Sequence, residues 1–266
     1  MYEFGFIGTG SMGGALAAAV CAGAGAERVL LANRTPEKAR KLAEQLKCAA
    51  GDNEMAAREA KFLFLGVKPQ MMAGMLTGIA PVLAEREGTV ILVSMAAGLS
   101  MERISAMAGG TFPVVRLMPN TPAAVGQGVI LYDCNGLVSE ADRERLTGAL
   151  APAGLVERIA EPQIDAASAV SGCGPAFCDL FLEALADGAV ACGLPRGTAM
   201  RCAAQMMLGT AKLALESGQH PGVLKDAVCS PGGSTIQGVR ALEANGFRGG
   251  VMEAVIAAYE RTLELG

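Results

Sequence analysis

Three glycines near the start of the chain constrain its fold more than any other feature. They form the pattern Gly8-x-Gly10-x-x-Gly13, which follows an apolar run at 4–7 and opens an Ala-rich stretch. In a strand–turn–helix unit, the first glycine makes the tight turn, the second lets a phosphate approach the backbone, and the third packs helix on strand. The pattern therefore predicts a dinucleotide-binding turn. A glycine turn that binds nothing is the alternative.

Strand and helix patterns alternate through the first 160 residues. Runs rich in β-branched residues predict strands at 3–7, 28–33, 61–67, 89–94, 114–118 and 128–133, with a further candidate at 155–159. Helical patterns lie between them, among others at 13–22, 35–46 and 70–83. Alternating units of this length predict an α/β fold of Rossmann type, with a mostly parallel, doubly wound sheet.

The strand patterns stop near Glu161-Pro162. Helical patterns follow at 163–170, 175–192, 196–217, 221–229, 235–244 and 248–265. We therefore expect a Rossmann domain at 1–160 and an all-α domain at 161–266. The helix that contains Cys202–Ala211 has no charge on any face of that stretch. Such a segment is buried all round, either at the centre of a helical core or in a contact between subunits.

Charge and cysteine usage exclude several classes of protein. The net charge is −4 and no basic cluster occurs, which argues against nucleic acid or an anionic membrane as a partner. The uncharged run at 4–26 contains seven glycines and follows Glu3, so it reads as a strand, a turn and a helix rather than a membrane span or signal peptide. Eight cysteines without a CxxC pair indicate reduced thiols in a cytoplasmic protein. The single histidine, His220, makes a metal site improbable.

The residues that follow the second expected strand bear on the choice of dinucleotide. An NAD-binding protein usually has Asp or Glu about 20 residues beyond the glycine turn, where it holds the ribose 2′-OH. This chain has Asn33-Arg34-Thr35 instead. Arg34 can pair with a 2′-phosphate, and Asn33 and Thr35 can donate hydrogen bonds to it. The sequence therefore predicts NADPH as the preferred cofactor and NADH as a weaker one, with Arg34 as a solvated surface charge being the alternative.

Two further strand ends are candidates for the cofactor crevice, because ligands of such sheets bind beyond the carboxyl ends of the strands. Val67-Lys68-Pro69 ends one strand, and Met95-Ala96-Ala97 follows the next. Lys68 is expected to position the cofactor rather than to act as an acid. Asn120-Thr121 either borders the nicotinamide or caps a turn.

The stretch Ser230-Pro231-Gly232-Gly233-Ser234-Thr235 predicts a second anion site. It lies between helical patterns at 221–229 and 236–244. A glycine-rich turn at a helix N-terminus points several backbone N–H groups at one spot, where the helix dipole favours negative charge. We expect this turn to bind a small carboxylate.

The residues available for acid–base chemistry limit the reactions that the protein can catalyse. With one histidine and no His–Asp pair, an imidazole-based hydroxyacid dehydrogenase is improbable, and the G-K-x-x-N motif of β-hydroxyacid dehydrogenases does not occur. Reduction of a protonated imine fits better, because an iminium carbon accepts hydride readily.

The sequence resembles the pyrroline-5-carboxylate reductase family from end to end. The most specific match is Leu224–Ile236, which contains the Ser-Pro-Gly-Gly-x-Thr turn. Supporting matches are Phe6-Ile7-Gly8, Val67-Lys68-Pro69, Met118–Pro122 and Val170–Ala176.

The resemblance implies NAD(P)H-dependent reduction of Δ1-pyrroline-5-carboxylate to L-proline by an interlocked homodimer, often assembled into a decamer, with an active site that combines both subunits. It implies that the turn holds the substrate carboxylate and that Thr235 relays a proton near the ring nitrogen. Asn53 matches a position that contacts the adenosine ribose. The substrate-binding residues are then Ser230, Gly232, Gly233, Ser234 and Thr235, with Thr235 catalytic. The cofactor-binding residues are Ile7, Gly8, Thr9, Gly10, Ser11, Met12, Gly13, Asn33, Arg34, Thr35, Asn53, Val67, Lys68, Pro69, Met95, Ala96 and Ala97.

Two other functions are open from the residues. One is a reductase of the same fold that acts on another cyclic imine or a β-hydroxyacid. The other is a non-catalytic sensor that binds NADPH and reports its level to a partner protein. The intact carboxylate turn argues against the sensor.

Overall fold

A computed structural model describes residues 1–265, without the side chain of residue 265. Eight strands form one sheet: β1 (Tyr2–Ile7), β2 (Val29–Ala32), β3 (Ala49–Gly51), β4 (Ala60–Leu65), β5 (Ile91–Ser94), β6 (Val114–Met118), β7 (Gly128–Cys134) and β8 (Gly154–Arg158). Their order is β3-β2-β1-β4-β5-β6-β7-β8, and every neighbouring pair is parallel except β6 and β7. The predicted doubly wound sheet is confirmed, and the order reverses between β1 and β4, where such sheets bind ligands.

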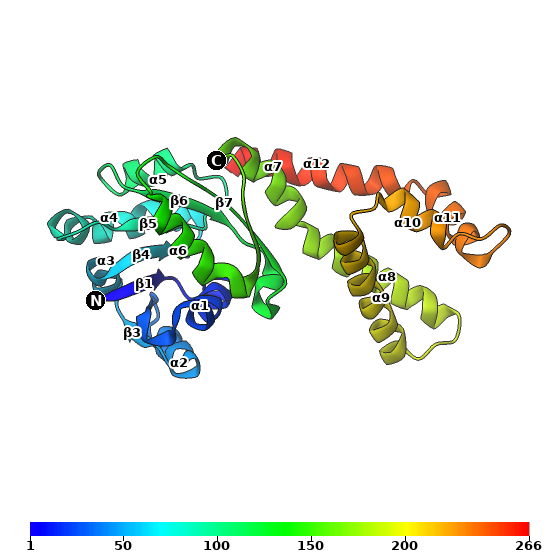
Figure 1. The fold of residues 1–266 in the computed structure, drawn as a ribbon, viewed down its shortest axis with the longest axis horizontal. Helices are drawn as coiled ribbons and strands as arrows, with labels where there is room; N and C mark the ends of the chain where they lie inside the picture. The colour runs from blue at the N-terminus through cyan, green and yellow to red at the C-terminus, as the bar shows by residue number, and fades with distance from the viewer. Residues whose placement is uncertain (266) are drawn as a thin grey trace. The chain divides into compact units, whose positions relative to one another are not determined.

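Helices cover both faces of the sheet (Figure 1). One face packs on α1 (Ser11–Ala24), α2 (Pro36–Leu46) and α6 (Glu140–Leu150). The other packs on α3 (Asn53–Glu59), α4 (Pro69–Glu85) and α5 (Met101–Met107). The central strands are apolar on both faces because each face contacts helices. The ring centroids of Phe6 and Phe64 lie 4.2 Å apart across β1 and β4.

The structure contains elements that the sequence patterns did not predict. Strand β3 consists of Ala49, Ala50 and Gly51, which lack the β-branched side chains on which strand prediction rests. It forms because its backbone pairs with β2. Helices α3 and α5 have seven residues each and are too short for a clear helical period. Each begins at a side-chain cap, since Asp52 accepts from the Met55 N–H and Ser100 accepts from the Arg103 N–H.

The remaining helices are α7 (Glu161–Ser171), α8 (Gly174–Ala191), α9 (Arg196–Ser217), α10 (Pro221–Ala227), α11 (Ser234–Ala244) and α12 (Phe247–Leu265). Residue contacts divide the described chain into one unit of 1–172 with 258–265 and a second unit of Cys173–Ala257. Helix α7 belongs to the first unit, since Ile164 packs on Met118 and Leu131 of the sheet. The division by contacts thus falls twelve residues after the expected domain boundary at 160.

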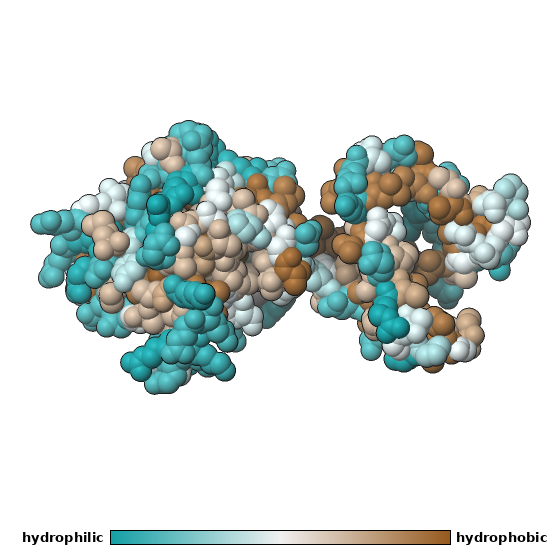
Figure 2. Space-filling model, turned by 60° about the horizontal axis from the view of Figure 1, so that its bottom comes forward, coloured by the Kyte–Doolittle hydropathy of each residue, from teal (hydrophilic) through white to brown (hydrophobic). Residues whose placement is uncertain are grey.

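The second unit lacks a core of large apolar side chains. Its buried hydrophobic residues are three alanines, Ala186, Ala199 and Ala203. Large apolar side chains are exposed instead, for example Leu180 (69%) and Leu215 (84%). Figure 2 shows this apolar surface in brown on the helical part. The charge-free stretch Cys202–Ala211 of α9 is mostly exposed within one chain, so the interpretation as a core helix is wrong for the single chain. A surface this apolar marks a contact with another molecule.

Candidate functional site: a dinucleotide turn and a carboxylate turn

The glycine turn between β1 and α1 is built for close approach of a ligand. Gly8 has a φ of +101°, and a Cβ there would lie 2.4 Å from the Gly66 carbonyl oxygen. A Cβ on Gly13 would lie 2.1 Å from the carbonyl oxygen of Gly8. A Cβ on Gly10 would meet nothing within 4 Å. The first and third glycines are therefore required by the fold, whereas the second keeps a space open above the backbone.

The start of α1 leaves polar groups without partners at this turn. Gly10 is the N-cap of α1 and has no side chain to accept from the first N–H groups of the helix. The Thr9 hydroxyl oxygen is buried and has no hydrogen-bond partner in the described chain. These groups and the open space over Gly10 fit a pyrophosphate, which would accept hydrogen bonds from the helix N-terminus. Ser11 and Met12 form the first turn of this helix, and Ile7 ends β1.

Asn33 connects the end of β2 to the glycine turn. Its side-chain oxygen accepts a hydrogen bond from the Thr9 N–H at 3.2 Å, and its amide donates to the Thr35 carbonyl oxygen at 3.1 Å. The side chain that sequence analysis expected to donate to a phosphate thus holds two loops together. Thr35 is the N-cap of α2, and its side chain makes no capping bond.

A polar pocket of 680 Å³ lies beside these loops. Asn33, Arg34 and Asn53 all line it. The sequence predicted that these three residues contact one cofactor, although Asn33 and Asn53 lie 20 residues apart in the chain. Arg40 on α2 and Asp52 before α3 also line it, and sequence analysis missed both. The signal for Arg40 was its place about one turn into α2, the helix that follows Arg34.

The other expected cofactor contacts lie at the carboxyl ends of β4 and β5, the two strands next to β1 on one side. Lys68 is the N-cap of α4 and Pro69 is its first residue, after Val67 in the loop from β4. Met95, Ala96 and Ala97 follow β5, and the Ala96 N–H donates to the buried Ser94 hydroxyl at 3.4 Å. The tertiary fold therefore brings all three segments to the same edge of the sheet as the glycine turn.

Asn120 serves the fold. Its oxygen accepts from the Val129 N–H at 2.8 Å, and its amide donates to the Ser171 carbonyl oxygen at 2.9 Å. It is 7% exposed. The side chain thus ties the end of α7 to β7, and Thr121 starts a short 3₁₀ helix, Thr121–Val125.

The segment Ser230–Gly233, which we expect to bind a carboxylate, forms a turn that leads into the N-terminus of α11, as the sequence predicts. The Gly233 N–H donates to the Ser230 carbonyl oxygen at 3.0 Å, and Gly232 has a φ of +69° after Pro231, a combination typical of a type II turn. A Cβ on Gly233 would lie 2.4 Å from the Ser230 hydroxyl oxygen.

Helix α11 then begins at Ser234, with Gly233 as an N-cap that accepts nothing through a side chain. Its first N–H groups and the exposed side chains of Ser230, Ser234 and Thr235 can therefore contact a small anion.

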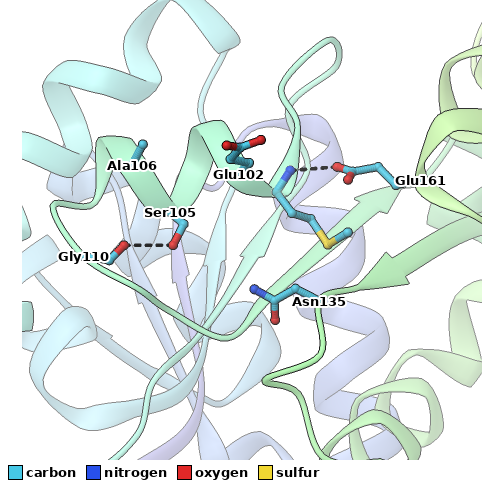
Figure 3. Close-up of a pocket in the computed structure, with 7 residues that line it drawn as sticks. Glu102, Ser105, Ala106, Gly110, Asn135 and Glu161 are labelled. Carbon is cyan, nitrogen blue, oxygen red and sulfur yellow. Dashed lines mark hydrogen bonds between the residues drawn. The ribbon is translucent and has the colours of Figure 1, made fainter.

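A separate cavity of 460 Å³ next to α5 offers little to a ligand. The Ser105 hydroxyl donates to the Gly110 carbonyl oxygen and accepts from Phe112, and Glu161 accepts from the Met101 N–H (Figure 3). The side-chain oxygen and amide of Asn135 both bond backbone groups nearby. The polar side chains here stabilise the loop after α5.

The glycine turn, its unpartnered helix N-terminus and the polar pocket at the end of β2 are features of a dinucleotide-binding protein. Comparisons with known proteins specify it further. A family model described as "Pyrroline-5-carboxylate reductase dimerisation" matches residues 161–265, and one described as "NADP oxidoreductase coenzyme F420-dependent" matches residues 3–98.

The pyrroline-5-carboxylate reductase of Escherichia coli (strain K12) is 38% identical, over 99% of this chain and 98% of its own length. That of Pisum sativum is also 38% identical, over 99% and 96%. The crystal structure of the Plasmodium falciparum pyrroline carboxylate reductase with NADP bound is 32% identical with a TM-score of 0.88, over 100% and 98% of the two chains. The chain belongs to the pyrroline-5-carboxylate reductase family.

The family also accounts for the exposed apolar helices. The stretch Glu161–Ala191 is long and apolar enough to cross a membrane by length and composition, which is weak evidence taken alone. This stretch lies inside the dimerisation region at 161–265. The match to this model supports a homodimer, and a unit whose buried hydrophobic residues are only alanines has apolar surface available for such a contact.

Proposed function

We propose that the protein reduces Δ1-pyrroline-5-carboxylate to L-proline with NADPH, the last step of proline biosynthesis. One observation carries this proposal: a dinucleotide turn and a Ser-Pro-Gly-Gly-Ser-Thr carboxylate turn occur in one chain that is similar along its whole length to reductases of that name. The residues fit a nicotinamide dinucleotide, because the space over Gly10 and the unpartnered Thr9 hydroxyl can take its pyrophosphate, and Arg34 at the end of β2 fits the 2′-phosphate of NADPH.

The chain's contribution to catalysis is binding and orientation. When bound, NADPH would supply a hydride to the C=N carbon, and the ring nitrogen takes up one proton as the imine becomes the amine of proline. Residues of the first unit hold the dinucleotide through the glycine turn and the pocket at Arg34. Ser230 and the N–H groups of α11 hold the substrate carboxylate, and the Thr235 hydroxyl relays the proton at the ring nitrogen. Fixing the two reactants in this way removes most of the entropic barrier to reaction.

The first test mixes purified protein with NADPH and pyrroline-5-carboxylate and follows the absorbance of the reduced nicotinamide. Oxidation with proline as the product supports the proposal. Turnover of pyrroline-2-carboxylate or piperideine-6-carboxylate in preference to this substrate would assign a different cyclic imine. Tight NADPH binding without turnover of any imine would favour the sensor.

Thr235→Ala tests the proton relay. Loss of a group that transfers a proton in the transition state lowers turnover by roughly 100-fold or more. The affinity for NADPH should stay within about twofold, because the turn lies outside the dinucleotide residues. Thr235→Ser keeps the hydroxyl and should recover most of the turnover. Normal turnover in Thr235→Ala would remove this residue from the mechanism.

The proposal also covers how dimers assemble further and where in the cell the protein acts. We expect dimers to associate into a decamer in the cytoplasm and the active site to combine both subunits. Sedimentation of the purified protein distinguishes a dimer from a decamer.

A further inference from the structure

Two arginines differ from all the others in the chain. Of the fifteen arginines, every one except Arg34 and Arg40 has a hydrogen bond, ion pair or other electrostatic partner within the described residues. Most of the paired arginines are on the surface, so exposure alone does not leave a guanidinium without a partner here. Both unpaired arginines line the same 680 Å³ pocket at the end of β2.

The acidic residues of this pocket have partners elsewhere. The Asp52 carboxylate accepts a hydrogen bond from the Met55 N–H at 2.7 Å and so caps α3. Glu54 lies 4.0 Å from Arg58, one turn further along that helix. Asp52 and Glu54 thus have partners within α3, whereas neither Arg34 nor Arg40 forms an ion pair with them.

The position of the two arginines selects a particular anion. Arg34 directly follows the loop residue Asn33, at the end of the strand where a dinucleotide places its adenosine ribose. A ribose 2′-phosphate carries close to two negative charges, and a guanidinium binds phosphate oxygens through paired N–H donors. The amide of Asn33 donates one of its two N–H groups to the Thr35 carbonyl oxygen and carries no charge, so Arg40 is the second cation that the pocket offers to such an anion.

We propose that Arg40 binds the 2′-phosphate of NADPH together with Arg34 and sets the preference for NADPH over NADH. The inference rests on the dinucleotide binding that the proposed function includes. Arg40 reaches the pocket because α2 starts at Pro36 and runs along its edge. A competing role would place the Arg40 guanidinium against the adenine ring, which is common to both cofactors.

The test measures the dissociation constants of NADPH and NADH by isothermal titration calorimetry, for the full chain without substrate. Arg40→Ala should weaken NADPH roughly 10- to 100-fold and leave NADH within about twofold, because only NADPH carries the phosphate. Arg40→Lys should recover part of the loss, since it keeps the charge without the paired donors. Lys41→Ala is the matched control: Lys41 neighbours Arg40 on α2, is exposed and does not line the pocket. It should bind both cofactors like the wild type.

Equal weakening of NADPH and NADH in Arg40→Ala would overturn the proposal in favour of an adenine contact. Unchanged NADPH binding, or a wild type that binds NADH as tightly as NADPH, would also overturn it. The experiment needs no turnover. A protein that binds both cofactors as expected yet reduces no imine would refute the reductase function and leave the role of Arg40 intact. Alanine and arginine are both good helix formers, so an exposed change on α2 should preserve the fold.

Discussion

Gly10→Ala should separate cofactor binding from stability. Gly10 has a φ of −71° and a ψ of −170°, which any residue can adopt, and an added Cβ meets no protein atom within 4 Å. Alanine reduces the entropy of the unfolded chain and so stabilises by about 0.4–1 kcal/mol. It is a poorer N-cap than glycine, by roughly 0.5 kcal/mol or more. The two effects nearly cancel, so the free energy of unfolding should change by less than about 0.5 kcal/mol.

Cofactor binding should respond much more strongly. The new methyl group occupies the space through which a pyrophosphate approaches the first N–H groups of α1. Losing one or two hydrogen bonds to a charged group costs about 2–4 kcal/mol in total. At about 1.4 kcal/mol per tenfold, this corresponds to roughly a 30- to 1000-fold rise in the dissociation constant of NADPH.

Calorimetric titration with NADPH and urea unfolding at a fixed protein concentration measure the two effects. Gly74→Ala is the matched control, because Gly74 lies inside α4 and its added Cβ also meets nothing within 4 Å. It should stabilise the protein by about 1 kcal/mol without changing the affinity for NADPH. A Gly10→Ala variant that binds NADPH within threefold of the wild type would refute the assignment of this turn to the pyrophosphate.

Three ion pairs yield further predictions. The side chain of Arg116 is 4% exposed and bonds the Asp165 carboxylate at 2.5 Å, so Asp165→Ala should lower the free energy of unfolding by about 2–4 kcal/mol. Glu264→Ala, which removes an exposed ion pair with Arg261, should change it by less than about 0.5 kcal/mol. Urea unfolding measures both changes. Hydrogen bonds from Arg145 hold the pKa of Glu3 below its ordinary value. The ionised carboxylate therefore stabilises the fold at every pH above the pKa that Glu3 has in the unfolded chain. This contribution is lost as the pH falls through the lower pKa that Glu3 has in the folded chain. Glu3→Gln should therefore destabilise the protein by about 1 kcal/mol at pH 7, and the difference from the wild type should shrink below about pH 4; a pH-independent difference would contradict the role of the charge.

The local features of the sequence predicted much of the fold. Glycines at 8, 10 and 13 and the alternating apolar runs act within a few residues of one another, so they define the strand–turn–helix unit and the class of sheet without knowledge of the partners. The turn at Ser230–Gly233 is equally local, since Pro231 and Gly232 suit its two central positions. The family resemblance added the reaction and the dimer.

Only the tertiary structure decided what distant residues do together. Strand β3 exists because β2 supplies its hydrogen bonds, and its own three small residues carry no strand signal. Asn120 left two roles open in the sequence, and the fold places Val129 and Ser171 against its two ends. The apolar stretch of α9 was compatible with a core helix until the structure exposed its side chains. In the sequence Arg40 resembles any surface arginine, but the fold places it in the same pocket as Arg34, and neither has an ion pair within the described residues. Turns and helix starts depend on neighbours in the sequence, whereas strand pairing, burial and charge pairing depend on residues that only the folded chain brings together.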